Sequence, residues 1–259
     1  ANTAGVTSVT YTLPTGCRST TSFVVNPLPA AITGTRVLCN GSTTTLANAS
    51  AGGNWSTSNP AIADIDAMTG EVTGNGAGVT SVMYTLPTGC SRSANVTVNA
   101  LPAAITGSMA VCEGSTTQLA TTSNGGTWSS DNTAVVTVSN SGLVSGVAAG
   151  GANIMYTLPT GCRTTTAVVV NALPANITGA TSVCLGQQAT VLNATMGGTW
   201  TSSNTGIADV DGTGAVTGMG AGTAVLRYTI TATGCSRTKS FVVNPLPAAI
   251  TGTMSVCQG

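Results

Sequence analysis

The sequence contains no histidine and very little charge. Lysine and arginine together number 7, as do aspartate and glutamate, so charged residues make up 5% of the 259 and the net charge is zero. Histidine is the side chain that most readily exchanges a proton near neutral pH. A basic surface is what neutralises nucleic-acid phosphates. We therefore expect no enzyme, no catalytic or metal-ligating residues, no cofactor and no nucleic-acid partner.

Aromatic residues and long apolar runs are scarce too. Aromatics account for 3% of the chain, and no apolar stretch approaches the roughly 18–20 residues of a membrane helix, so no membrane span is expected in this segment. Yet 42% of the residues are hydrophobic, and the valines alternate with polar residues. This differs from the charged, apolar-poor composition of disordered chains. The composition predicts a secreted all-β protein.

What the sequence has in abundance is repetition. YTLPTGC occurs at 11–17, 84–90 and 156–162, and YTITATGC at 228–235. Two sets of cysteines recur at intervals of 73, 72 and 73 residues: Cys17, Cys90, Cys162 and Cys235, and Cys39, Cys112, Cys184 and Cys257. A period of about 73 residues is too long for one turn of a solenoid and suits a small independent domain.

Proline-containing joints, such as VNPLPAAITG at 25–34, separate the units. They predict three complete repeats: 27–99, 100–171 and 172–244. Residues 1–26 match the C-terminal strands of a preceding repeat, and residues 245–259 match the first strand of a following one. We therefore expect the chain to be a window in a longer tandem array.

Within the first repeat, apolar alternation and turn residues predict seven short strands. These lie near 31–38, 42–48, 53–58, 61–66, 70–74, 78–86 and 92–99. Seven short strands with a tryptophan on the third indicate an immunoglobulin-like β-sandwich. We expect tandem sandwiches of about 73 residues arranged as an elongated rod. The repeated aromatic residues are expected in the cores: Trp55, Trp128, Trp200, Tyr84, Tyr156 and Tyr228.

The segment 39–85 resembles the bacterial immunoglobulin-like group 2 repeat. The similar motifs are Thr45-Leu46-Ala47, Trp55-Ser56-Thr57-Ser58-Asn59, Gly70-Glu71-Val72-Thr73-Gly74 and, in the third repeat, Ala221-Gly222-Thr223. The cysteines in C-x-G and T-G-C contexts are similar to those of PKD-like repeats in giant secreted surface adhesins and filaments of Bacteroidota-type bacteria. The resemblance covers essentially the whole chain and implies an Ig-like fold in an extracellular stalk, adhesin arm or fibre.

Eight cysteines in this context indicate disulfides, because zinc sites show closer pairs than the spacings of 22 and 51 residues found here. Three pairing schemes fit the period. Cysteines can pair within a repeat, across a joint (Cys17–Cys39, Cys90–Cys112, Cys162–Cys184, Cys235–Cys257), or between non-adjacent positions of neighbouring domains, such as Cys39 with Cys162.

The resemblance favours pairing within repeats, as Cys39–Cys90, Cys112–Cys162 and Cys184–Cys235. Closing a loop of about 50 residues would stabilise a weakly cored domain by roughly 3–4 kcal/mol. Cys17 and Cys257 would then pair with cysteines of repeats outside this segment of the array. A geometric conflict stands against this choice, because the two cysteines of one sandwich could lie at opposite ends.

Three motifs invite a functional interpretation that their context does not favour. LPTG, which is similar to a sortase signal, is better interpreted as the turn between the last two strands. Asp64 with Asp66 and Asp209 with Asp211 could suggest calcium or glycosidase chemistry, but the middle repeat replaces the pair with Thr137 and Ser139. The N-x-S/T triplets are common by chance in such a sequence; they begin at Asn40, Asn48, Asn54, Asn95, Asn176 and Asn193.

The leading functional hypothesis is a structural segment of an extracellular bacterial surface filament used for attachment or cell contact. Outward-facing Val24, Val169 and Val242, with Thr97 as the exception, favour self-association into a multi-chain fibre. The alternative is a monomeric spacer of a giant adhesin, whose glycan- or cell-binding module lies elsewhere in the full chain. Few aromatics are available for a binding platform in these repeats themselves.

Overall fold

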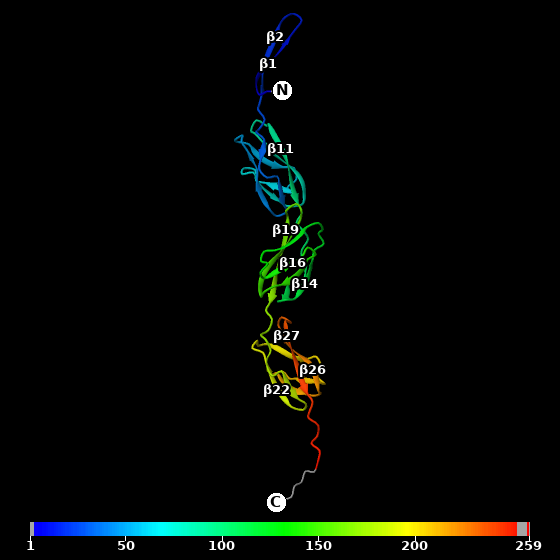
Figure 1. The fold of residues 1–259 in the computed structure, drawn as a ribbon. Coiled ribbons are helices and arrows are strands. Elements are labelled where there is room, and N and C mark those ends of the chain that lie inside the picture. The colour runs from blue at the N-terminus through cyan, green and yellow to red at the C-terminus, as the bar shows by residue number, and fades with distance from the viewer. Residues whose placement is uncertain (1–2, 253–257, 259) are drawn as a thin grey trace. The chain divides into compact units, whose positions relative to one another are not determined.

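All regular elements among residues 3–252 and 258, which the computed structural model describes, are β-strands (Figure 1). The all-β prediction is confirmed. Apart from one N-terminal hairpin, the strands form pairs of facing sheets, and each sheet takes its strands from a single one of the predicted repeats. We refer to residues 27–99, 100–171 and 172–244 as the first, middle and third repeats.

The first repeat contains nine short strands. They are β3 (Ile32–Thr33), β4 (Val37–Cys39), β5 (Thr43–Thr45), β6 (Ala47–Asn48), β7 (Asn54–Thr57), β8 (Ala63–Ile65), β9 (Glu71–Gly74), β10 (Gly78–Thr85) and β11 (Ser91–Asn99). One sheet has the order β4-β11-β10-β7, and the opposite layer consists of β5-β9-β8 and β3-β6. Strand β4 runs parallel to β11, whereas the other neighbours are antiparallel.

Two of the seven expected strands of this repeat are each divided in the structure. The segment predicted at 31–38 splits into β3 and β4, which belong to different sheets. The chain changes sheet at Gly34, whose φ of 107° lies outside the strand region. The segment predicted at 42–48 splits into β5 and β6 at Leu46, whose backbone N–H donates to Gly70 O instead of continuing either ladder.

The middle and third repeats follow the same plan. The middle repeat contains β12 (Thr106–Gly107), β13 (Ala110–Cys112), β14 (Thr116–Ala120), β15 (Thr127–Ser130), β16 (Val136–Val138), β17 (Leu143–Gly146), β18 (Gly150–Thr157) and β19 (Arg163–Asn171). The third contains β20 (Thr178–Gly179), β21 (Ser182–Cys184), β22 (Gln188–Leu192), β23 (Gly198–Ser202), β24 (Ala208–Val210), β25 (Ala215–Gly218), β26 (Gly222–Ile230) and β27 (Ser236–Asn244). As β4 does with β11, β13 runs parallel to β19 in the middle repeat, and β21 runs parallel to β27 in the third.

The core of the first repeat lies between its two layers. Val82 and Val96 of one sheet face Val72 of the other, and all three are fully buried. Each such side chain contributes roughly 1.5–3 kcal/mol through removal from water. The alternation of apolar and polar residues in β10 and β11 therefore reflects one buried and one solvated face.

An aromatic pair closes one end of this core. The rings of Trp55 and Tyr84 lie 4.8 Å apart, and both side chains are buried. Tyr84 donates its hydroxyl hydrogen to Ser50 O at 2.6 Å and accepts from Gly53 N at 2.9 Å. A Cβ on Gly53 would lie 2.6 Å from the Tyr84 ring, which explains the glycine before each tryptophan strand. Tyr156 and Tyr228 are also buried, whereas Trp128 and Trp200 are half-buried.

The N-terminal hairpin pairs β1 (Gly5–Thr12) with β2 (Arg18–Val25), and its apolar side chains are exposed. Tyr11 is 70% exposed and Phe23 58%, whereas their counterparts in the third repeat, Tyr228 and Phe241, are buried. The hairpin thus has the sequence and register of the last two strands of a repeat, without an opposing sheet among the described residues.

The chain divides into two compact units. The first comprises residues 1–104, 121–127 and 156–164, and the second comprises 105–120, 128–155 and 165–259. The division passes through the middle repeat. Its loop 121–127 and its last hairpin turn belong with the first repeat, and its remaining strands belong with the third.

Candidate functional site at the joints between repeats

Each described C-x-G segment forms a tight turn at the end of a strand. In the first repeat, Ser42 N donates to Cys39 O at 3.0 Å, and Gly41 adopts a φ of 79°. Glycine at the third position of such a turn is what a type II geometry requires. Cys39 pairs with Asn99 in the parallel ladder of β4 and β11. The turn therefore lies at the exit end, the end at which the chain leaves the repeat.

The T-G-C segments lie at the opposite end of each repeat, in the hairpin turn between its last two strands. Leu86 N donates to Cys90 O and Gly89 N donates to Leu86 O, both at 2.9 Å. The three-residue loop Pro87-Thr88-Gly89 ends in a glycine with a φ of 84°, as three-residue hairpins commonly do. The interpretation of LPTG as a turn is confirmed. This turn lies at the entry end, because Cys90 Sγ approaches the backbone oxygen of Asn26 at 3.8 Å.

Disulfides connect the exit end of one repeat to the entry end of the next. Cys39 of the first repeat bonds to Cys162 of the middle repeat, and Cys112 of the middle repeat bonds to Cys235 of the third. Both bonds have a Cα–Cα distance of 5.6 Å and a sequence separation of 123 residues. Cys162 and Cys235 are buried, so the joint shields these sulfurs from solvent.

The pairing expected within repeats is therefore wrong: the structure forms none of Cys39–Cys90, Cys112–Cys162 and Cys184–Cys235. The reason is the geometric conflict already visible in the sequence. Cys39 lies beside Asn99, and Cys90 precedes the other end of the same nine-residue strand. At about 3.3 Å per residue the two cysteines are roughly 30 Å apart, far beyond the 7 Å that a disulfide spans.

The remaining cysteines occupy the same two positions of the repeat. Cys17 and Cys90 lie at hairpin turns and Cys184 at a C-x-G turn, and all three are free thiols. The expectation that Cys17 and Cys257 pair outside the window stays a prediction, and Cys257 lies outside the described residues. Spacing alone could not have selected the observed scheme, because cysteines flanking one joint have an equally constant separation of 22 residues.

The proline-containing linker, which includes the first residues of each repeat, is hydrogen-bonded to the body of the repeat that it enters. Ala30 N donates to Ser50 Oγ at 2.9 Å, and Asn48 Nδ2 donates to Ala30 O at 2.7 Å. In the third repeat Thr195 Oγ1 and Asn193 Nδ2 bind Ala175 in the same way. In the middle repeat the same contacts on Ala103 come from Ser123 and Thr121.

These contacts give a structural role to two of the N-x-S/T triplets. Ser50 N also donates to Asn48 Oδ1 at 2.9 Å, which closes a local turn. Both ends of the Asn48 side-chain amide are therefore hydrogen-bonded. Thr195 N donates to Asn193 Oδ1 in the same way. The sequence pattern alone did not indicate that the asparagine and hydroxyl residue together hold the linker. Combined with proline, which restricts φ, this anchoring fixes the path of the chain into the repeat.

The second aspartate of each pair serves a turn, whereas Asp64 and Asp209 lie in strands β8 and β24. Asp66 accepts hydrogen bonds from Thr69 N, Thr69 Oγ1 and Met68 N, and these bonds hold the pKa of its carboxyl below the usual range. In the third repeat, donors on Thr213 and Ala215 likewise lower the pKa of Asp211. Ser139 occupies the same turn in the middle repeat. Within residues 3–252 and 258, no cluster of three or more Cys, Asp or Glu residues could hold a metal ion.

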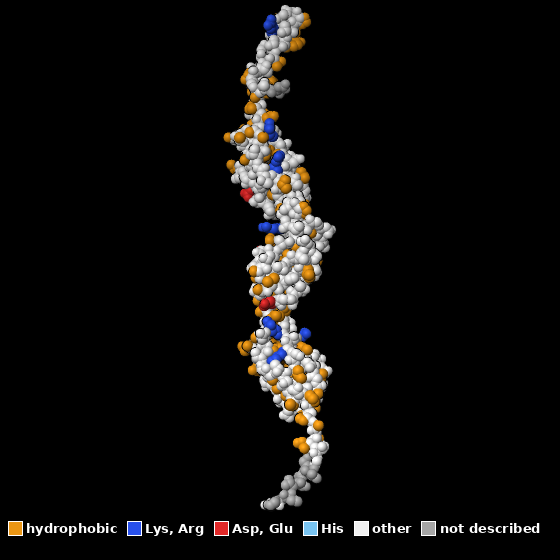
Figure 2. All heavy atoms as spheres, viewed as in Figure 1, with side chains coloured by type: hydrophobic (Ala, Val, Ile, Leu, Met, Phe, Trp, Pro, Cys, Tyr) orange, Lys and Arg blue, Asp and Glu red, His pale blue; other side chains and the backbone are white. Residues whose placement is uncertain are grey.

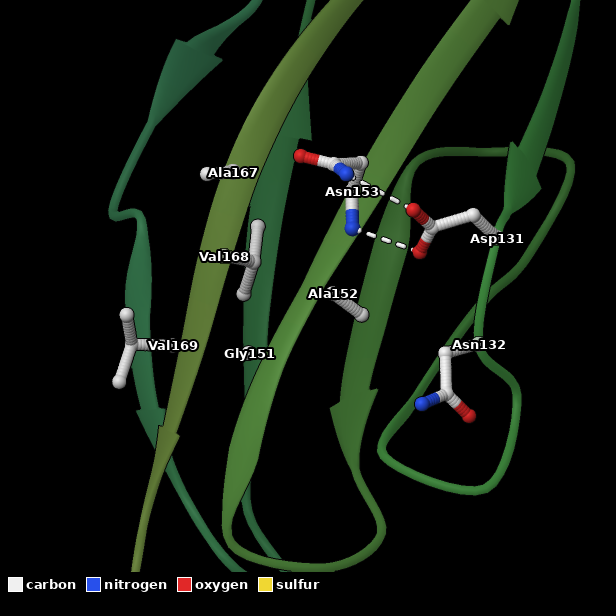
Figure 3. Close-up of a pocket in the computed structure, with 8 residues that line it drawn as sticks. All are labelled: Asp131, Asn132, Gly151, Ala152, Asn153, Ala167, Val168 and Val169. Atoms are coloured by element: carbon white, nitrogen blue, oxygen red, sulfur yellow. Dashed lines mark hydrogen bonds between the residues drawn. The ribbon is translucent and has the colours of Figure 1, made fainter.

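The middle repeat has a shallow hollow of about 450 Å³, open to solvent, beside Asp131 (Figure 3). Both carboxylate oxygens of Asp131 point at Asn153 and accept from its backbone N–H and its side-chain amide, at 2.8 and 2.7 Å. These bonds lower the pKa of Asp131. Ser58 and Ser203 replace the aspartate in the other repeats, and their hydroxyl oxygens accept the equivalent bonds from Ser81 N and Val225 N. The contact therefore links the end of one strand to its neighbour in every repeat, and only the carboxylate and the side-chain amide are particular to the middle one.

No helix within the described part of the chain has the length and apolar character required to cross a bilayer. The joints, with their disulfides and anchored linkers, recur with the same geometry between the described repeats. They are the candidate functional feature of the chain.

Comparison with known proteins gives a family for the central part of the chain. Residues 94–169 match the bacterial Ig-like domain (group 2), and no curated protein matches. Among solved structures, invasin, a bacterial integrin-binding protein, is 15% identical with a TM-score of 0.38, over 93% of this chain and 65% of that one. Domains 1–6 of the surface layer protein SbsC are 18% identical with a TM-score of 0.26, over 94% and 45%.

A 282-residue C-terminal fragment of intimin, solved with the intimin-binding domain of its translocated receptor, is 14% identical with a TM-score of 0.38. That match covers 57% of this chain and 67% of the fragment. At these identities and TM-scores, the solved structures by themselves assign no function. The chain spans less than two thirds of the invasin and SbsC structures that it matches.

Proposed function

We propose that this chain, in which residues 94–169 belong to the bacterial Ig-like group 2 family and the other repeats share their sequence, is a structural segment of an extracellular stalk or filament. The observation that carries the proposal is the pair of disulfides joining each complete repeat to the next. Such bonds form and persist in oxidising compartments outside the cytosol. The rod arrangement predicted from the sequence is part of the proposal, which includes no catalytic role.

Immunogold electron microscopy tests this location and form. Antibodies raised against the recombinant chain are expected to label projections on intact cells of the source bacterium, without permeabilisation. A cytoplasmic protein labelled in parallel provides the control for cell integrity. Labelling that requires permeabilisation would place the chain inside the cell and would contradict the proposal.

We further propose that the segment associates laterally with copies of itself in a multi-chain fibre. The support is a set of exposed valines at equivalent positions of the last strand, which we call the valine row; two lie on the outer face of a four-stranded sheet and one on β2 of the N-terminal hairpin. Val24, Val169 and Val242 are all exposed in the structure, as their positions predicted. In the first repeat, Thr97 lies between Val37 and Val79, and both valines are more than half exposed.

Charge is sparse in the view of Figure 2, where few blue and red side chains are visible. With so few charges, little electrostatic repulsion opposes close approach of two chains, and burying the valine row would remove apolar surface from water. Exposed apolar rows of this kind mark association surfaces.

Adding charge to this row is expected to abolish the association. In the triple variant Val24→Lys, Val169→Lys and Val242→Lys, lateral packing would bury three ammonium groups, so sedimentation velocity should show a shift from assemblies to monomers. The matched control carries the same three charges on the opposite layers and loops, as Leu143→Lys, Val147→Lys and Leu192→Lys, which replace residues of comparable exposure. It should keep the wild-type distribution.

A wild-type chain that remains monomeric at all concentrations would instead favour the spacer of an adhesin whose binding module lies elsewhere. Equal loss of association in both triple variants would contradict the assignment of the valine row, because it would indicate a general effect of charge.

A further inference from the structure

We infer that the disulfides provide a second covalent connection across every joint between complete repeats, so that the array holds tension along two interleaved covalent paths. The first joint is crossed by the peptide chain between residues 99 and 100 and by Cys39–Cys162. The second is crossed by the peptide chain between residues 171 and 172 and by Cys112–Cys235. The role under tension rests on the proposed function as a stalk or filament; the covalent paths themselves do not.

The two paths alternate between peptide chain and disulfide. The first follows β4 to Cys39, crosses to Cys162, and continues through β19 and the next linker to Cys184. The second follows β11 and its linker to Cys112, crosses to Cys235, and continues along β27. At each joint one path crosses as the linker while the other crosses as the disulfide.

This arrangement leaves the middle of each repeat off both paths. The segments 40–89, 113–161 and 185–234 each connect one path to the other, and they contain most strands of the sandwich. In contrast, the segment from Cys162 to Cys184 consists of β19, a linker, β20 and β21, whose strands are already extended. About 22 residues can span at most about 75 Å, so this path has little length to release under tension.

The covalent paths are short because β4, β13 and β21 each run parallel to the last strand of their own repeat. Because β13 runs beside the exit end of β19, Cys112 and the linker after Asn171 leave the middle repeat at the same end. Because Cys235 Sγ lies 4.0 Å from Asn171 O, the hairpin turn of the third repeat meets that end directly. Pairing within a repeat would place no bond across a joint.

Single-molecule stretching of the full chain between its two termini tests the paths. Cys17, Cys90, Cys184 and Cys257 are replaced by serine throughout, so that the two observed disulfides alone remain. With both bonds present, the shortest covalent route runs from residue 1 to 39, back from 162 to 112, and from 235 to 259. That is about 112 residues, or roughly 390 Å at about 3.5 Å per residue.

The signature of interleaving is a non-additive response. Removing either bond alone, as Cys39→Ser with Cys162→Ser or as Cys112→Ser with Cys235→Ser, should lengthen the maximum extension only about 1.2-fold, because the other bond still bypasses its own loop. Removing both should lengthen it about 2.3-fold, to roughly 900 Å. Reduction of the parent protein should reproduce the double removal. The readout is the length of the extended chain, and it applies to each single-removal variant in which the remaining disulfide has formed.

Two outcomes would overturn the inference. With the four cysteines that remain, Cys112–Cys162 is the one bond possible within a repeat; either double replacement would then lengthen the maximum extension by about 50 residues, and combining the two would add nothing further. An extension that does not change on reduction would show that neither bond forms. All these outcomes test the covalent paths. The cell-surface labelling tests the proposed function, and its result does not depend on them.

Cleavage in one linker provides a second readout. A specific protease site introduced after Leu101 should yield a nicked chain that runs at full mass without reductant and separates into two fragments with it. The same site in the Cys39→Ser, Cys162→Ser variant should release both fragments without reductant. Release from the chain with both disulfides intact would overturn the inference.

Discussion

Replacing Trp55 with alanine is expected to lower the free energy of unfolding of the first repeat by about 3–5 kcal/mol. The indole is buried, its ring packs against Tyr84 at 4.8 Å, and its Nε1 edge lies so close to Gly70 that no Cβ would fit there. Removing it leaves a cavity in a core that contains few other aromatic residues. Calorimetry of the full chain should show the transition of this repeat at a lower temperature.

Two variants separate packing from general disturbance. Trp55→Phe keeps part of the ring contact with Tyr84 and should recover a substantial part of the loss. Met68→Ala removes a large side chain that is 87% exposed and should leave the transition unchanged. A Trp55→Ala protein that melts like the wild type would show that the aromatic pair does not hold this core together.

The double replacement of Cys39 and Cys162 by serine is expected to destabilise the chain by about 4–5 kcal/mol. The bond closes a loop of 123 residues, and its removal restores the corresponding entropy to the unfolded chain. The loop includes most of the first repeat and most of the middle one, so the loss should appear in the unfolding of both repeats. Denaturant unfolding followed by circular dichroism measures it.

The matched control is the double replacement of Cys17 and Cys90 by serine, which removes two free thiols from equivalent hairpin turns. It should leave stability within a few tenths of a kcal/mol of wild type, since no covalent bond is lost. A Cys39→Ser, Cys162→Ser protein as stable as this control would show that the bond does not constrain the unfolded chain.

Much of the fold was predictable because local chemistry and the repeat agree. The alternation of Val82 and Tyr84 placed one face of the strand inward, and the structure buries both. The Pro-Thr-Gly run predicted a hairpin turn because proline and a glycine with positive φ suit that geometry. The divided strands were missed, because a change of sheet at Gly34 depends on Leu46 and its neighbours, which are distant in sequence.

The candidate site was less predictable, because it depends on which ends of the sandwich meet. By itself, the sequence determined that the chain is an array of Ig-like repeats and that its cysteines occupy two constant positions in tight turns. Only the tertiary structure decided how those cysteines pair. The parallel ladder of β4 and β11 puts Cys39 one strand length away from Cys90, and stacking of the next repeat brings Cys162 within 5.6 Å between Cα atoms. Disulfide geometry tolerates the second arrangement and forbids the first.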